Sequence, residues 1–186
     1  TWKILDLNTL KDLPDTLEWI KFQKVAWLPD GSGFYYASYP APKDPLEQVN
    51  IGQTLHFHTL GAAQADDPLI YERPDQPEWG SDPKVTEDGS TLLISIGRGT
   101  EEKNLLMMKD LTQAEAPITP IIESWDAFFV SLGKVGEDLI LFTDLDAPKG
   151  RVIKAPNMTA DRSQWVEIVP EAEETLQGAS AVGGGI

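Results

Sequence analysis

Cysteine is absent from the 186 residues of this chain, and histidine occurs only twice. The lack of cysteine excludes disulfide bonds and thiolate zinc sites. There is no run of about eighteen apolar residues, and the N-terminus lacks the basic and then apolar pattern of a secretory signal, so neither a membrane span nor a signal peptide is predicted. We expect a cytoplasmic protein, with the periplasm as the alternative, and no cofactor.

Basic residues are also few. The 15 Lys and Arg residues against 30 Asp and Glu give a formal net charge of -15, which repels polyanions. This balance argues against binding nucleic acid or an anionic membrane. Long stretches with the i, i+3, i+4 spacing of an amphipathic helix are missing too, so an α/β or all-helical class is disfavoured.

The chain instead repeats one hairpin pattern. Residues 25–40, VAWLPDGSGFYYASYP, alternate in polarity, turn around Asp30-Gly31 and resume as an aromatic strand. A second copy, KVTEDGSTLLISI, spans residues 84–96 with Asp88-Gly89 in the turn. A looser third copy, AFFVSLGKVGEDLILFT, spans residues 127–143. Each copy predicts two antiparallel strands.

Hairpin repeats of this length are typical of a β-propeller, in which each blade is a four-stranded sheet. The sequence therefore predicts an all-β fold, a β-propeller segment of about three four-stranded antiparallel blades with partial blades at both ends. Blades are expected at residues 25–78, 79–126 and 127–171, with the end of a blade at 1–24 and the start of another at 172–186. Because the first residue is not Met and lies inside the pattern, we expect a longer parent chain.

Between the strands we expect several connecting features. A short strand is predicted around residues 17–20, a crossover between blades at 74–82, a loop at 97–103 and a single helical turn at 171–177. Residues 179–182 are predicted to begin the next blade.

Six pieces of sequence follow one another along nearly the whole chain. They are VAWLPDGSGFYYASYP at 25–40, LHFHTLG at 55–61, DPLIYERPDQPEW at 67–79, VTEDGSTLLISI at 85–96, FTDLDAPKGRVI at 142–153 and WVEIVPE at 165–171. This ordered set resembles the propeller domain of the prolyl oligopeptidase (prolyl endopeptidase) family of serine peptidases. The resemblance implies a propeller that gates an α/β-hydrolase domain of the same parent chain, which cleaves short peptides after proline.

The residues that perform the family's catalysis are not expected in this chain. A G-x-S-x-G turn is needed to expose the serine nucleophile, and none occurs. The closest string, GASAVG at residues 178–183, is one residue too long and has no histidine after it. We therefore predict that the α/β-hydrolase domain is absent and that the chain alone is inactive.

His56 and His58 form an H-x-H pair that points to one face of a strand, a spacing that metal sites use. A zinc site needs a third or fourth ligand, and the sequence indicates only scattered carboxylates. We interpret the pair as half-buried imidazoles and predict no metal site.

Four substrate-binding residues follow from the resemblance alone. The family's aromatic residue in a distal subsite corresponds to Tyr35. An arginine that contacts the substrate backbone corresponds to Arg98, and Thr100 occupies a second contact position in the same loop. Gly80 stands where the family has a methionine, which puts the apolar depth of the distal pocket in doubt.

Two rival functions remain open at this stage. A stand-alone propeller would bind partners on its loop face, and a coding sequence that continues into G-x-S-x-G would exclude it. A sugar- or metal-binding propeller enzyme would need clustered His and carboxylate residues on inner strands, against which two histidines on one strand argue. Uncovered blade faces also predict that the isolated chain self-associates.

Overall fold

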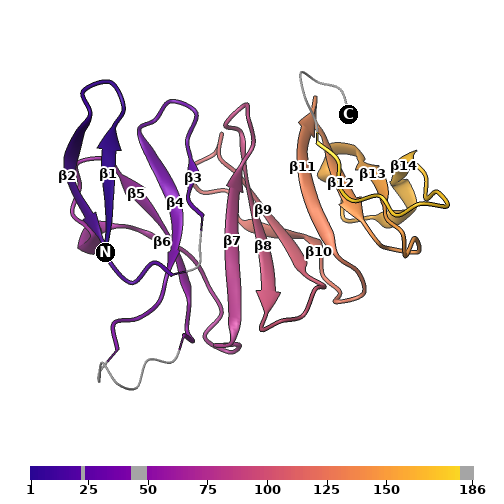
Figure 1. Cartoon of the computed structure of the whole chain (residues 1–186), viewed down its shortest axis with the longest axis horizontal. Coiled ribbons are helices and arrows are strands. Elements are labelled where there is room, and N and C mark those ends of the chain that lie inside the picture. The colour runs from indigo at the N-terminus through magenta and orange to yellow at the C-terminus, as the bar shows by residue number, and fades with distance from the viewer. Residues whose placement is uncertain (22–23, 43–49, 181–186) are drawn as a thin grey trace. The chain divides into compact units, whose positions relative to one another are not determined.

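The computed structural model describes residues 1–21, 24–42 and 50–180. In this part of the chain the secondary structure consists of β-strands and three short 3₁₀ turns (Figure 1). The chain divides into two compact units, Thr1–Val85 and Thr86–Ile186. None of the helical segments in the described ranges is long and apolar enough to cross a membrane.

In the sheets of the described residues, neighbouring strands run antiparallel. A two-stranded sheet comes first, followed by three four-stranded sheets in which strands consecutive in sequence lie side by side. The first sheet pairs β1 (Trp2–Asp6) with β2 (Lys11–Leu17). The first four-stranded sheet consists of β3 (Ala26–Trp27), β4 (Gly33–Ser38), β5 (Thr54–Thr59) and β6 (Leu69–Glu72). The second consists of β7 (Trp79–Val85), β8 (Thr91–Arg98), β9 (Leu105–Asp110) and β10 (Ile118–Ile122). The third consists of β11 (Phe129–Val135), β12 (Asp138–Thr143), β13 (Arg151–Ala155) and β14 (Val166–Val169).

The predicted all-β class, with three four-stranded antiparallel sheets and a partial sheet before them, is therefore confirmed. The three 3₁₀ turns are η1 (Gln64–Asp66), η2 (Pro156–Met158) and η3 (Arg162–Gln164).

The repeated turns form for the reason that the sequence suggested. Gly31 and Gly89 have φ of 72° and 71°, a left-handed conformation that glycine adopts without steric cost. In both turns the preceding aspartate accepts hydrogen bonds from the amide and hydroxyl of the serine two residues later. Local side-chain chemistry thus closes the hairpins.

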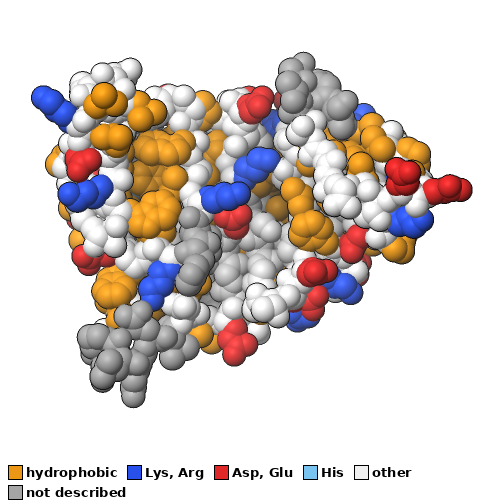
Figure 2. Space-filling model, viewed as in Figure 1, with side chains coloured by type: hydrophobic (Ala, Val, Ile, Leu, Met, Phe, Trp, Pro, Cys, Tyr) orange, Lys and Arg blue, Asp and Glu red, His pale blue; other side chains and the backbone are white. Residues whose placement is uncertain are grey.

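Apolar strands fill a separate core in each unit. In unit 1, Leu17 and Ile20 pack with Phe34 and Tyr36, so the two-stranded sheet shares a core with β4. The core of unit 2 lies between its sheets and contains buried residues from β8 to β13: Leu93, Leu106, Ile121, Ile122, Ala127, Phe129, Leu139, Leu141, Ile153 and Ala155. Hydrophobic side chains also reach the surface over the N-terminal strands (Figure 2). Leu5, Leu7 and Leu10 are exposed hydrophobic residues of this segment.

Several predicted boundaries were wrong. The strand expected around residues 17–20 begins earlier, at Lys11, and the chain leaves it near Trp19, whose φ is 60°. Residues 79–82, expected in a crossover, belong to β7, where Pro83 is tolerated because β7 is an edge strand. Gly97 and Arg98 extend β8 instead of opening a loop.

Predictions for the C-terminal residues were also wrong. The helical turn predicted at 171–177 is absent, because this segment bonds to Lys149: the amide of Leu176 donates to the Lys149 carbonyl at 2.8 Å, and Glu171 accepts from the Lys149 amide. Residues 179 and 180 are not in a strand. Residues 181 and 182, the rest of that predicted strand, lie outside the described residues.

Candidate functional site

Arg98 is held in place at the end of β8. Its guanidinium carbon lies 4.4 Å from the centre of the Trp125 ring, and Nη2 is 3.6 Å from Glu101 Oε2. The backbone turns directly after it, with a hydrogen bond from the Glu101 amide to the Arg98 carbonyl. Thr100 is exposed in this turn. The Arg98 side chain remains 44% exposed, so one side of the guanidinium is available to a ligand.

Tyr35 and Gly80 lie in unit 1. Tyr35 is only 6% exposed in β4, and its ring packs on Phe57 with 4.8 Å between the centroids. Burial raises the pKa of the Tyr35 hydroxyl. A β-carbon added at Gly80 would lie 3.4 Å from Gln53 Oε1, an ordinary van der Waals contact, and that oxygen also accepts a hydrogen bond from the Ser81 amide. A β-carbon at position 80 would therefore contact Gln53 without a clash.

The histidines differ from the expected half-buried pair. His58 is 0% exposed and lies between two carboxylates, with Nε2 3.0 Å from Asp15 Oδ1 and Nδ1 3.0 Å from both Asp67 oxygens. The Tyr36 hydroxyl donates to Asp67 at 2.7 Å, and the Gly61 amide donates to Asp15 at 2.5 Å. His56, by contrast, is partly exposed and bonds Thr54 Oγ1.

The contacts of the buried His58 network agree with the directions of the pKa shifts of Asp15 and Tyr36. Because both ring nitrogens face carboxylate oxygens, the geometry suits an imidazolium that donates to both. Burial raises the pKa of Asp15, but hydrogen bonds from Gly61 and His58 outweigh burial and hold that pKa below its ordinary value. Burial and the hydrogen bond to Asp67 raise the pKa of Tyr36. The network joins β2 to β5 and to the segment before β6.

Among the described residues, His58 is engaged on both ring nitrogens and is not available as a base for a serine. His58 has carboxylates on both nitrogens, and in the described ranges no group of three or more His, Cys, Asp or Glu side chains is arranged to hold a metal ion. Within the string at 178–183, Ser180 is exposed, and residues 181–183 lie outside the described residues.

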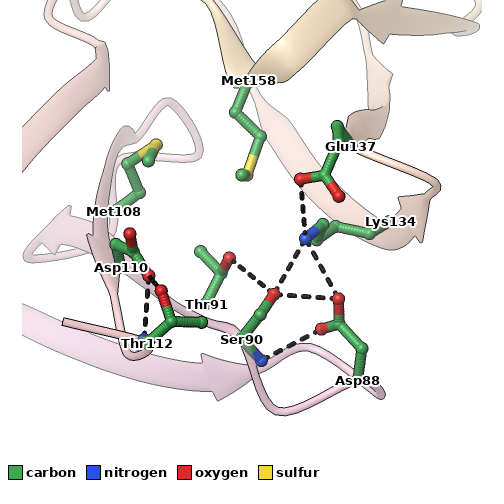
Figure 3. A pocket seen from close by; sticks show the side chains of 9 residues that line it. All are labelled: Asp88, Ser90, Thr91, Met108, Asp110, Thr112, Lys134, Glu137 and Met158. Carbon is green, nitrogen blue, oxygen red and sulfur yellow. Dashed lines mark hydrogen bonds and ion pairs between the residues drawn. The ribbon is translucent and has the colours of Figure 1, made fainter.

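A pocket in unit 2 was not foreseen from the sequence (Figure 3). Its cavity has a volume of about 240 Å³ and lies among the β8 and β9 strand ends and three turns. The lining residues are Asp88, Ser90, Thr91, Met108, Asp110, Thr112, Lys134, Glu137 and Met158. Sequence reasoning recognised the Asp88-Gly89 turn, but it did not bring that turn together with Lys134.

Lys134 is the central cation of this pocket. Its side chain is only 7% exposed, and Nζ donates to Ser90 Oγ at 2.8 Å and to Asp88 Oδ2 at 3.0 Å. Glu137 Oε2 lies 3.5 Å from the same nitrogen. Hydrogen bonds from Thr86 first, and then from Ser90 and Lys134, outweigh burial and hold the pKa of Asp88 well below its ordinary value.

Comparisons with known proteins identify similar chains. The family described as prolyl oligopeptidase, N-terminal beta-propeller domain, matches residues 1–185. The chain is 34% identical over 176 residues to the prolyl endopeptidase of Elizabethkingia meningoseptica, covering 94% of this chain and 24% of that protein. It is 32% identical over 170 residues to prolyl oligopeptidase A of Amanita bisporigera, covering 86% and 22%.

Solved structures agree in fold. A structure from a study of two prolyl endopeptidases superposes with a TM-score of 0.84 at 25% identity, covering 97% of this chain and 26% of that one. Prolyl oligopeptidase B of Galerina marginata, bound to a 25mer macrocyclization substrate, gives a TM-score of 0.79 at 26% identity, covering 87% and 23%. The chain thus spans about a quarter of the length of the relatives that it matches.

Proposed function

Because the chain belongs to the prolyl oligopeptidase family, as a segment of its N-terminal β-propeller domain, we propose that it is the non-catalytic gate of a serine peptidase that cleaves short peptides after proline. The observation that carries this proposal is the family match over residues 1–185, together with the three four-stranded sheets. In this proposal the propeller screens substrates by size before they reach the catalytic domain.

The chemistry of the described residues supports a non-catalytic role. Acyl transfer needs an activated hydroxyl and a base that takes its proton. The sequence has no G-x-S-x-G, and His58 is buried between Asp15 and Asp67. The α/β-hydrolase domain of the parent chain would supply nucleophile and base, and short proline-containing peptides would be the substrates.

Within this role we assign the substrate contacts that the resemblance implied. Arg98 would donate to the peptide backbone, because its guanidinium is fixed on Trp125 yet partly exposed. Thr100 lies in the adjoining turn. Tyr35 would form part of an apolar wall of the distal subsite, and Gly80 would leave that wall without the family's methionine side chain.

The experiment uses the intact parent enzyme with a long and a minimal proline peptide. We expect Arg98→Ala to lower kcat/KM for the long peptide about tenfold, since a hydrogen bond to a charged group contributes about 1.5 kcal/mol or more. Arg73→Ala is the matched control, because Arg73 also lies 4.4 Å over a tryptophan, Trp79, and pairs with a nearby carboxylate. Equal losses in both variants would remove Arg98 from the substrate site.

A second arm tests the non-catalytic assignment. The 186-residue chain alone should not hydrolyse a proline reporter peptide. Proline-specific cleavage that persists after a serine-directed inhibitor has removed contaminating peptidases would contradict the assignment. A parent gene without any G-x-S-x-G segment would favour the stand-alone binding propeller instead.

A further inference from the structure

We propose that the pocket of unit 2 binds an organic cation, an ammonium or guanidinium group on a short aliphatic stem, about the size of an arginine side chain. Its 240 Å³ cavity corresponds to about eight water molecules at about 30 Å³ each, which leaves room for such a side chain. The pocket is built from segments far apart in sequence, including the turn at residues 88–90 and the hairpin at 134–137.

The charge balance of the lining favours a cation. Asp88, Asp110 and Glu137 carry three negative charges against the one positive charge of Lys134, which leaves a formal charge of -2. Lys134 is the one cation of this lining for all three carboxylates: its nitrogen lies 3.0 Å from Asp88 and 3.5 Å from Glu137, and its charge also lowers the pKa of Asp110. A bound cation would therefore be attracted by the negative charge that remains on the lining.

Asp110 is the carboxylate best placed to receive the ligand. Its described hydrogen bonds come from neutral donors, namely the amide and hydroxyl of Thr112 and the Gln113 side chain. These bonds, with the Thr112 hydroxyl first, lower the pKa of Asp110, so it is ionised at neutral pH. Figure 3 shows Asp110 across the pocket from Lys134 and Glu137.

Two methionines distinguish an organic cation from a metal ion. Met108 and Met158 extend into the same space above Thr91 (Figure 3). Their flexible, polarizable thioethers suit contact with an aliphatic stem and a guanidinium plane. A hard metal cation would instead need several converging oxygen ligands, and in the described ranges no group of three or more His, Cys, Asp or Glu side chains is arranged to hold a metal ion.

The test is an NMR titration of the 186-residue chain with agmatine. We expect one saturable site, with amide shifts centred on residues 88–90, 110–112 and 134–137. Asp110→Asn should weaken binding about fivefold, as expected when one partly exposed charge pair is lost. Asp161→Asn is the matched control, because Asp161 also accepts from an amide, a hydroxyl and a glutamine side chain and carries the same charge.

Three results would overturn the proposal. These are the absence of saturation, shifts centred outside the pocket, or equal weakening by Asp110→Asn and Asp161→Asn, which would indicate only long-range attraction by an acidic chain. Should Asp110→Asn perturb folding, Thr112→Lys places a competing amine at an exposed position of the rim and should abolish binding; unchanged binding would refute the site.

A second probe tests whether the bound cation is a free amine or a basic side chain of a peptide. N-acetyl-arginine methylamide carries the same guanidinium on a capped peptide unit. Binding of both probes would assign the pocket to a basic side chain of a peptide, and binding of agmatine alone would assign it to a free amine. Binding of neither would overturn the proposal.

Discussion

Replacing His58 with alanine should destabilise unit 1 more than any change at the neighbouring histidine. The two ring nitrogens of His58 lie 3.0 Å from carboxylate oxygens of Asp15 and Asp67, whose side chains are 1% and 2% exposed. His58→Ala removes the ring and leaves each of two buried carboxylates without one hydrogen-bond partner.

The expected loss is about 2–6 kcal/mol, because each of the two buried carboxylates loses a hydrogen bond at a cost of about 1–3 kcal/mol. Domains are commonly stable by about 5–15 kcal/mol, so the variant should lose a large part of its folding free energy. His56→Ala is the matched control on the same strand. His56 is partly exposed and bonds only Thr54 among the described residues, so we expect a loss of about 1 kcal/mol.

Hydrogen exchange followed by mass spectrometry can locate the effect. In His58→Ala, the protection of backbone amides against exchange should fall in residues 11–17 and 54–60. Amides of unit 2, such as those of residues 91–98, should keep their protection. Urea denaturation then gives the size of the loss. Equal destabilisation by His58→Ala and His56→Ala would refute the reasoning, because the burial of the two carboxylates would then carry no penalty.

Two further predictions concern unfolding free energies. Hydrogen bonds from Arg162 hold the pKa of Asp126 below its ordinary value. The ionised carboxylate therefore stabilises the fold above about pH 4, and this contribution is lost as the pH falls. Asp126→Asn should make the free energy of unfolding, measured in urea, decrease less between about pH 5 and pH 2. Gly33→Ala should cost about 2 kcal/mol, because its β-carbon would lie 2.3 Å from the His58 carbonyl oxygen, whereas Gly97→Ala, with nothing within 4 Å, should leave the melting temperature nearly unchanged. Equal melting temperatures for the two glycine variants would contradict the second prediction, and an unchanged acid profile would contradict the first.

Local chemistry explains which features could be predicted from the sequence. An Asp-Gly-Ser turn closes through bonds within three residues, so the hairpins at Gly31 and Gly89 were visible in the sequence. Strand ends depend on neighbouring strands instead. Pro83 lies in a strand because it occupies a sheet edge, and β8 continues to Arg98, beyond Ile96, the last residue that pairs with β9.

The networks escaped prediction because their partners are distant in sequence. His58 and Asp15 are 43 residues apart, and Lys134 and Asp88 are 46 apart. One signal was available for the first: His58 pairs across the sheet with Phe34, so it shares an aromatic face. A polar side chain on such a face must find a partner, since burial without a hydrogen bond costs about 1–3 kcal/mol. The pattern H-x-H therefore indicated a buried network at least as strongly as a metal site, and only the fold could show that Asp15 completes it.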